Sequence, residues 1–316
     1  MHLIKVCDTK NMPVEEWLKR RKNGIGGSDA GVLLGFNRYK GQFNVYVDKV
    51  TEHTEDLSEN EKVYWGNVFE PIVAKEFARR TGKKVERVNA ILRHPKYEYI
   101  IANIDRRVVG ENAILECKTT GAFNEAEWKD EEIPESYICQ CQHYMAVTGA
   151  EKCYIACLIG GQKLIIKTIL RDDEFIEYLL DAEIKFWKEF VLAGKPPDID
   201  GSADASRYLS NRFERSDGGS IQMTSDLEEL CSERQSLKKQ EADIKGKIAE
   251  YDNKIKLKMG ENAYAFGNRY KVSWVNTKGR KTLDADKLKS DFSIEDMEAY
   301  YKTGAPSRRF TIQEVG

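Results

Sequence analysis

The chain has 316 residues, 41% of them hydrophobic and 32% charged, so it can bury a sizeable core. It contains neither the roughly 20 consecutive apolar residues that cross a bilayer nor a basic N-terminal segment followed by an apolar run, so we expect a cytoplasmic protein that does not enter membranes. Seven scattered cysteines predict reduced thiols, and a net charge of -2 restricts any nucleic-acid site to a local cleft.

Helix-type and strand-type patterns alternate along residues 1–212, which predicts an α/β core with a central mixed sheet flanked by helices. Helices are expected at residues 14–22, 28–34 with Ser28 or Asp29 as the cap, 67–80, 134–147 and 172–193. Strands are expected at residues 84–92, 100–108 and 113–118, followed by a hairpin of residues 152–159 and 163–169.

A polar, glycine-containing stretch at residues 213–222 is typical of a linker, and residues 223–316 form a C-terminal extension. In residues 223–259, apolar residues recur at alternating steps of three and four, interrupted by Arg234 and Glu241. This spacing predicts a long helix of coiled-coil type that packs either on a partner chain or on its own chain. Residues 263–275 and 310–312 predict a small strand-rich unit with one helix at residues 284–290.

The residues that point most directly to chemistry are Asp105, Glu116 and Lys118, which fall on two neighbouring predicted strands. Residues two apart on a strand share a face, so Glu116 and Lys118 point one way and Cys117 the other. Paired carboxylates bind Mg²⁺, which phosphodiester hydrolysis uses, and a nearby lysine can orient the attacking water. An exposed polar strand face is the structural alternative.

Asp105 with Glu116-Cys117-Lys118 is similar to the PD-(D/E)XK nuclease signature, and the surrounding segments resemble its lambda-exonuclease/YqaJ branch. Ile104 stands where that signature has proline, and Arg106 stands where a small residue is usual. The resemblance spans roughly residues 15 to 200 and rests on motifs that occur in the family's order: Arg21 with Gly24 to Ala30, Trp65-Gly66-Asn67-Val68-Phe69-Glu70-Pro71, the Asp105 and Glu116-Cys117-Lys118 group, Gln140-Cys141-Gln142-His143-Tyr144-Met145, and the region of Trp187.

The resemblance implies that Asp105, Glu116 and the backbone carbonyl of Cys117 bind metal, while Lys118 positions water. It implies Mg²⁺ as the cofactor, with Mn²⁺ as an alternative and two ions per site. Glu70 is expected at the metal, directly or through water, rather than as an ordinary surface carboxylate.

The same resemblance places Gln142, and after it Gln140, in the cleft; a polar helix face is the alternative for both. The loop that contains Gly27 and Ser28 offers backbone N–H groups and a hydroxyl to a phosphate. In the family this loop and the preceding arginine are associated with the 5'-terminal phosphate of DNA, which implies binding by Arg21 and Ser28, with Arg20 as the competing arginine.

The expected function is therefore exonucleolytic digestion of one strand of linear double-stranded DNA from its 5' end. The 3' overhang would serve phage-type recombination in a bacterial host cell, with a single-strand annealing protein as a possible partner and a homotrimeric ring as the implied assembly. Two alternatives remain open: a structure-specific or site-specific DNA endonuclease of the same superfamily, and a non-catalytic DNA-binding or annealing protein.

Overall fold

A computed structural model describes residues 3–37, 39–51, 60–279, 282–292, 301–302 and 310–312. The chain divides into two compact units, Met1–Arg212 and Phe213–Gly316. Among the described helices, none is long and apolar enough to cross a bilayer.

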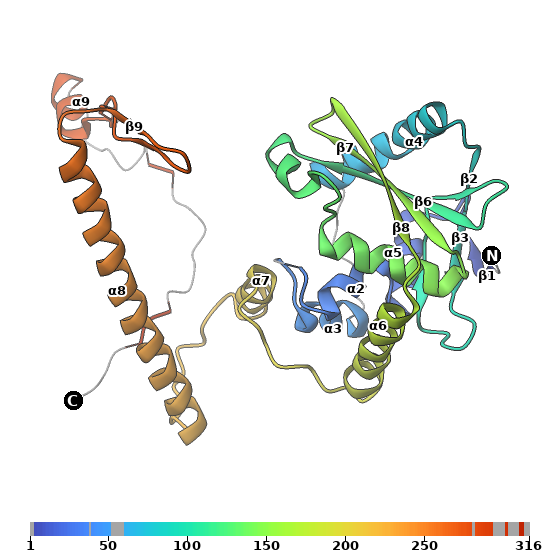
Figure 1. The fold of residues 1–316 in the computed structure, drawn as a ribbon. Helices are drawn as coiled ribbons and strands as arrows, with labels where there is room; N and C mark the ends of the chain where they lie inside the picture. The colour runs from blue at the N-terminus through green and yellow to red at the C-terminus, as the bar shows by residue number, and fades with distance from the viewer. Residues whose placement is uncertain are drawn as a thin grey trace. The chain divides into compact units, whose positions relative to one another are not determined.

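The central feature of the first unit is a five-stranded sheet in the order β2-β5-β6-β7-β8 (Figure 1). Strands β6 and β7 are parallel and the other pairs are antiparallel, so the sheet is mixed as predicted. The strands are β2 (Val85–Arg87), β5 (Arg106–Val108), β6 (Ala113–Thr120), β7 (Lys152–Ile159) and β8 (Lys163–Leu170).

A second, three-stranded sheet pairs β1 (Ile4–Asp8) with β3 (Ala90–Arg93) and β3 with β4 (Ile101–Ala102). The prediction of continuous strands at residues 84–92 and 100–108 was therefore wrong, because each stretch contributes one strand to each sheet. The crossing lies at Val88 and Asn89: the Val88 N–H donates to Asp105 (3.5 Å), whereas the Asn89 carbonyl accepts from Thr9 (3.1 Å). Apolar alternation continues through this crossing and does not reveal it.

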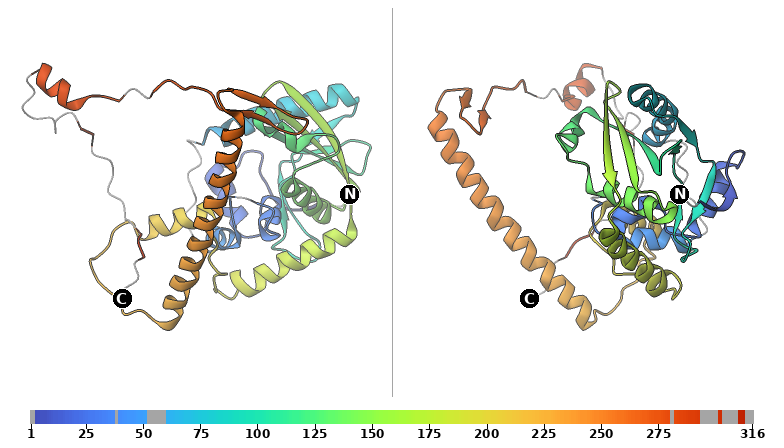
Figure 2. Two further views of the ribbon diagram at one scale, coloured as in Figure 1. Left: turned by 60° about the vertical axis from the view of Figure 1, so that its left-hand side comes forward. Right: turned by 45° about the vertical axis from the view of Figure 1, so that its right-hand side comes forward.

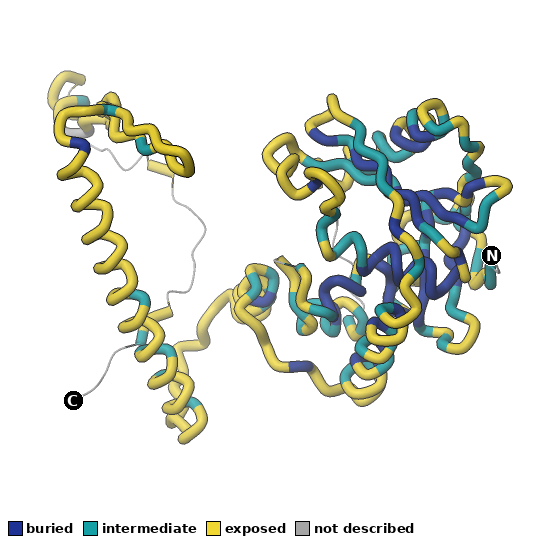
Figure 3. The backbone as a smooth tube through the Cα atoms, viewed as in Figure 1, coloured by how far each residue is buried: buried dark blue, intermediate teal, exposed yellow. Residues whose placement is uncertain are grey.

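Two helices cover the opposite faces of the five-stranded sheet. On one face, α5 (Glu135–Thr148) packs Cys141, Tyr144 and Met145 against apolar residues of β6, β7 and β8. On the other face, α4 (Glu61–Thr81) packs its residues Val73, Ala74 and Phe77. Figure 3 shows the buried backbone concentrated in the sheet and these facing helix turns.

Helix α4 begins earlier than predicted, at Glu61 rather than residue 67. The Asn60 side chain caps it by accepting hydrogen bonds from the N–H groups of Lys62 and Val63. Gly82, at φ 71°, adopts the left-handed conformation that ends it.

The remaining elements of this unit surround the core. Helix α2 begins at Gly27 with Gly26 as its cap, so the predicted caps Ser28 and Asp29 were wrong; Asp29 instead accepts a hydrogen bond from the Gly26 N–H (2.9 Å). The expected helix at 172–193 forms as α6 followed by a π-helical turn, η2. These elements are α1 (Val14–Lys22), α2 (Gly27–Leu33), α3 (Gln42–Val50), η1 (Ala122–Trp128), α6 (Asp173–Phe186), η2 (Trp187–Val191) and α7 (Ala203–Arg212).

The second unit consists mainly of the long helix α8 (Ser225–Met259), which both views in Figure 2 show as uninterrupted. It is followed by a hairpin of β9 (Tyr264–Phe266) and β10 (Lys271–Ser273), and by α9 (Ala285–Asp291). The expected long helix and small strands are confirmed. Residues 310–312 do not form the expected strand.

Candidate active site

A cleft of about 670 Å³ opens in the first unit, beside the ends of β5 and β6. The segment after β1, helices α1, α2 and α4, and helix α5 form its other walls. The structure brings most of the predicted site residues together in this cleft, which is lined by Arg21, Ser28, Glu70, Asp105, Glu116, Cys117, Lys118 and Gln140.

Glu116 and Lys118 lie on the face of β6 that meets α5, as the two-residue spacing predicted. The Lys118 Nζ is 2.7 Å from Glu116 Oε1, and Glu116 is only 4% exposed. Cys117 packs against the α4 side, as expected. Burial alone would lower the pKa of Lys118, but the Glu116 carboxylate outweighs it and holds that pKa above its usual value. Lys118 is therefore a cation suited to orienting water.

Asp105 lies directly before β5 and is fixed across the sheet by Cys117, whose N–H donates to Asp105 Oδ2 (2.8 Å). Burial raises the pKa of Asp105 well above its ordinary value, and the nearby Glu116 carboxylate raises it further. The buried Glu116 and the half-buried Asp105 thus form a pair of acidic groups that a cation would stabilise.

Gln140 links the members of the site. Its Oε1 accepts from Lys118 Nζ (2.8 Å), and its Nε2 donates to Glu116 Oε1 and to the Tyr144 hydroxyl (both 2.9 Å). The amide therefore fixes the lysine and the glutamate relative to each other. Tyr144 was missed from the sequence as a cleft residue, although its position one helical turn after Gln140 is a signal that could have found it.

The expectation that Gln142 lines the cleft is wrong. Two residues along a helix from Gln140, its side chain points elsewhere: Nε2 donates to the Leu170 carbonyl (2.9 Å), and Oε1 accepts from the Asp172 N–H (3.1 Å). Gln142 thus connects the end of β8 to the start of α6. His143 is also structural, buried between Glu183 and the Ile101 carbonyl.

The donor set fits a hard divalent cation. Glu116 Oε2 is buried and has no hydrogen-bond partner among the described residues, which is costly for a carboxylate unless a ligand occupies the position. In the described part of the chain, no three His, Cys, Asp or Glu side chains group closely enough to hold a metal by themselves. Asp105 and Glu116 could hold one with backbone and water oxygens, and Mg²⁺ is commonly bound by one or two carboxylates in this way.

Glu70 lines the cleft but is bound by arginines. Arg106 donates to Glu70 Oε1 (2.5 Å) and to the Asp105 carbonyl (2.8 Å), while Arg87 lies 3.5 Å from Glu70 Oε2. Arg106, noted in the sequence only as a departure from the family pattern, is 7% exposed and acts as the counter-ion of Glu70. The structure thus places Glu70 near the carboxylate pair and engages it with cations of the protein itself.

The glycine-containing loop and α1 form another wall of the cleft. Arg21 Nη2 donates to Ser28 Oγ (3.0 Å), and the guanidinium lies 4.7 Å above the Trp17 ring. Arg20 instead pairs with Glu16 (2.7 Å) and does not line the cleft. The two adjacent arginines are therefore separated by the structure, with Arg21 on the side of the site.

The loop is held rigidly behind these groups. Ile25 donates to the Tyr99 carbonyl (2.7 Å) and accepts from the Ile101 N–H (2.9 Å), which joins the loop to β4. Gly27 packs against α5 so closely that a Cβ there would lie 2.5 Å from a Tyr144 ring carbon and 3.0 Å from Gln140 Cγ. Gly27 therefore allows the start of α2 to approach the site.

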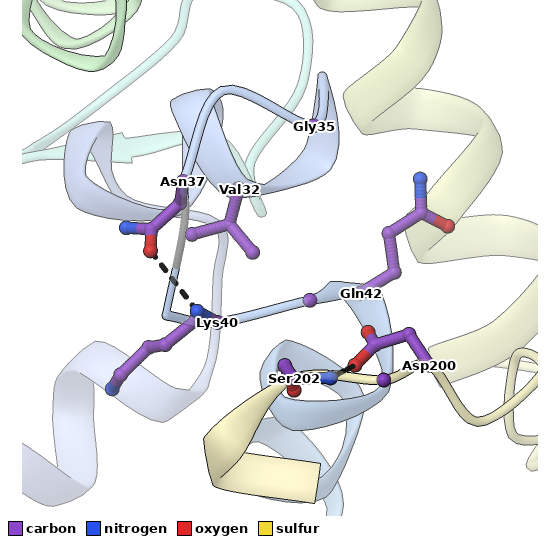
Figure 4. Close-up of a pocket in the computed structure, with 9 residues that line it drawn as sticks. Val32, Gly35, Asn37, Lys40, Gln42, Asp200 and Ser202 are labelled. Atoms are coloured by element: carbon purple, nitrogen blue, oxygen red, sulfur yellow. Dashed lines mark hydrogen bonds between the residues drawn. The ribbon is translucent and has the colours of Figure 1, made fainter. Parts of the chain in front are cut away.

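A second cavity, of about 390 Å³, lies between the segment after α2 and the segment before α7 (Figure 4). Figure 4 shows the Asn37 side chain accepting from the Lys40 N–H (3.0 Å) and the Asp200 side chain accepting from the Ser202 N–H (2.8 Å). These polar groups shape their own turns. None of the site residues predicted from the sequence lines this cavity.

Comparison with known proteins places the site in a family context. The sequence model of the YqaJ-like viral recombinase domain matches residues 16–151, the stretch that holds all the cleft residues discussed above from Trp17 to Tyr144. The uncharacterized protein YqaJ of Bacillus subtilis (strain 168) is 45% identical over 313 residues, which cover 98% of this chain and 97% of the relative.

Among solved structures, the chain is similar to an alkaline exonuclease, LHK-Exo, from Laribacter hongkongensis, with 20% identity and a TM-score of 0.49. The crystal structure of LHK-Exo in complex with dAMP gives 21% identity and a TM-score of 0.50, and covers 64% of this chain and 98% of that chain. This likeness concerns the fold and confirms the predicted α/β nuclease-type core.

Proposed function

Since the chain belongs to the YqaJ-like viral recombinase family, we propose that it is a divalent-metal-dependent exonuclease that digests one strand of linear double-stranded DNA from its 5' end. The fold that the chain shares with an alkaline exonuclease supports the proposal that the chain is a nuclease. The 3' overhang produced would serve recombination by strand annealing; the description of the matched family as a viral recombinase domain supports a role in recombination.

One observation supports the reaction most strongly: Glu116 Oε2 is buried and has no hydrogen-bond partner in the part of the chain that the structure describes, and Asp105 and Lys118 line the same cleft. Asp105 and Glu116 would hold Mg²⁺ or Mn²⁺, with the Cys117 carbonyl as a further oxygen donor. A cation bound there would polarise the scissile phosphate and lower the pKa of a water molecule. The family resemblance also implies a second metal ion at Glu70. To bind that ion, Glu70 would have to release its present partners, Arg106 and Arg87.

The protein's own side chains would then perform the remaining tasks. Lys118, fixed by Glu116 and Gln140, would hold the attacking water by a charge-assisted hydrogen bond. Gln140 would keep the lysine and the glutamate in register during the reaction. Arg87, which lines the cleft and is partly exposed, would contribute positive charge toward the DNA backbone.

Arg21 and Ser28, which line the same cleft, would bind the 5'-terminal phosphate. An arginine guanidinium can contact two phosphate oxygens at once, and the start of α2 adds the N–H groups of Gly27 and Ser28. A terminal phosphate held at a fixed distance from the carboxylates would favour cleavage at strand ends. We extend the proposal to a homotrimer that encloses the duplex, which would keep the enzyme on its substrate.

The test is digestion of three substrates: 5'-phosphorylated linear duplex, the same duplex without the phosphate, and a closed circle. Each is incubated with Mg²⁺ or with EDTA, and end labels identify the digested strand. We expect Mg²⁺-dependent loss from 5'-phosphorylated ends, with circles spared. Lys118→Ala is expected to be inactive, while Lys163→Ala, whose lysine pairs with Glu125 and does not line the cleft, serves as the matched control.

The two rival functions predict other outcomes. Cleavage of the closed circle would replace the exonuclease with an endonuclease that uses the same carboxylates. DNA binding without cleavage under either metal, unchanged by Asp105→Asn, would favour a non-catalytic binding or annealing protein.

A further inference from the structure

Helix α8 carries a stripe of large apolar side chains on the part of the chain that the proposed reaction does not use. Along the helix, the seam residues follow alternating steps of three and four, so they lie on one face. Its members are Leu227, Leu230, Arg234, Leu237, Glu241, Ile244, Ile248, Tyr251 and Ile255.

Most of this seam is in contact with solvent. Leu230, Leu237, Ile244, Ile248, Tyr251 and Ile255 expose between 42% and 65% of their surface. Within the second unit, the Phe310 ring lies 5.6 Å from the Arg234 guanidinium, at the first third of the seam. A continuous exposed apolar stripe on a helix of 35 residues is typical of an interface with another helix.

The two charged residues of the seam, Arg234 and Glu241, indicate the orientation in which a second copy of α8 can pair with the first. In a parallel, in-register pair of identical helices, each seam residue meets its own copy, so Arg234 faces Arg234 and Glu241 faces Glu241. Both layers then bring like charges together in a partly desolvated interface, and this electrostatic repulsion destabilises the parallel pair.

An antiparallel pair of the same helices removes both conflicts. The register that pairs the seam from Leu227 to Tyr251 places Leu230 opposite Ile248 of the second copy and Arg234 opposite Ile244 of the second copy. Glu241 of the second copy then lies opposite Leu237, in the next layer, about 4.5 Å along the axis from Arg234. Arg234 of each copy thereby lies near Glu241 of the other copy, and the symmetric pair contains two such contacts.

The residues beside the seam are compatible with this arrangement. The antiparallel register brings Asp226 near Lys254 of the second copy and Glu233 near Lys247 of the second copy, which are opposite charges. A parallel pair also finds opposite flanking charges, for example Glu233 with Lys238. The seam charges, rather than the flanking ones, therefore decide the direction.

We propose that α8 is a self-association helix that forms an antiparallel two-stranded coiled coil with α8 of a second copy of this chain. This interface is independent of the proposed nuclease reaction and of any ring formed by the first unit. A two-fold pair combined with a three-fold ring gives an even number of chains, so the full assembly contains two chains or a multiple of two.

Disulfide trapping in the full-length protein tests the direction of the pair. Cys231, the native cysteine of α8, is first replaced by serine, and this Cys231→Ser protein alone is the background control. The double variant Leu230→Cys, Ile248→Cys is expected to give a covalent dimer on oxidation, whereas each single variant is not. Covalent dimers from single Leu230→Cys would show a parallel pair and overturn the proposal.

A charge exchange provides the second test, read by sedimentation equilibrium. Arg234→Glu replaces two attractive contacts with two repulsive ones, so the dimer dissociation constant should rise about tenfold or more. Adding Glu241→Arg should restore the original value. In a parallel pair, Arg234→Glu would only exchange one like-charged layer for another, so the dissociation constant would change little. A mass independent of both changes, with no trapping in any variant, would show that the seam packs on its own chain.

Discussion

Gln140 and Gln142 lie two residues apart on α5, and the structure predicts different consequences for activity when each is replaced with leucine. Leucine has a similar volume, so each change removes an amide while preserving most of the packing. Gln142→Leu is expected to lower stability and leave the reaction intact. Gln140→Leu is expected to lower stability as well and, in addition, to lower kcat.

The magnitude for Gln142→Leu follows from its two hydrogen bonds, to the Leu170 carbonyl (2.9 Å) and from the Asp172 N–H (3.1 Å). Leaving each backbone group without its partner costs about 1–2 kcal/mol, or about 2–4 kcal/mol together. For a unit of this size, 1 kcal/mol corresponds to roughly 2–4 °C, so the Tm should fall by roughly 5–15 °C.

For Gln140→Leu, the ion pair between Lys118 and Glu116 (2.7 Å) remains when the amide is removed. The Glu116 carboxylate and the Tyr144 hydroxyl each lose a buried donor, however, so we also expect the Tm to fall by about 5 °C or more. The lysine loses the acceptor that orients it, and misplacement of a catalytic group by about 1 Å can reduce kcat about 100-fold.

The two variants are compared by differential scanning calorimetry and by initial rates of nucleotide release from 5'-phosphorylated duplex at a temperature where both are folded. If Gln142→Leu lost activity at native-like stability, or Gln140→Leu melted early and remained fully active, the assignment of the two amides would be refuted.

Three further predictions concern other parts of the first unit. Arg21→Ala should raise KM for 5'-phosphorylated ends about 10-fold or more and abolish the preference over dephosphorylated ends, whereas Arg20→Ala should change neither, as steady-state kinetics on the two substrates will show. Gly27→Ala should cost about 1–3 kcal/mol by urea denaturation because its Cβ overlaps a tyrosine ring at 2.5 Å, whereas Gly66→Ala, with open space at its Cβ, should not destabilise the protein. Burial would lower the pKa of His143, but its buried carboxylate partner Glu183 raises that pKa above the ordinary value. The contribution of protonated His143 to the free energy of unfolding is therefore complete below about pH 6 and is lost as the pH rises through the raised pKa. Unfolding curves from about pH 6 to 9 should show this loss of stability, and the His143→Gln variant should show less of it.

The parts predicted well from the sequence are those governed by local periodicity. Helix α1 begins and ends at the predicted residues, and the hairpin of β7 and β8 differs only by one residue at its end. Alternation along β6 also placed Glu116 and Lys118 on one face and Cys117 on the other. These features depend on neighbouring residues and on the two-residue repeat of a strand.

The features that were missed depend on contacts between distant segments. The crossing of the chain between the two sheets at Val88 is fixed by hydrogen bonds to different strands, which a local pattern does not contain. Similarly, Gln140 and Gln142 carry the same side chain in the same motif, and only the helix rotation and the position of β8 separate their roles. Arg106 looked like a deviation because its partner, Glu70, is distant in sequence.

The pairing of β1 has a consequence for how the chain folds during synthesis. Ile4 lies opposite Arg93, so β1, which leaves the ribosome before β3, must wait for β3 before it can pair with it. Thr9 and Lys10, which follow β1 directly, are part of the cleft wall. The cleft is therefore completed late, after α4 has been made, so a nascent chain would carry the loop at Gly27 and Ser28 before the cleft is complete.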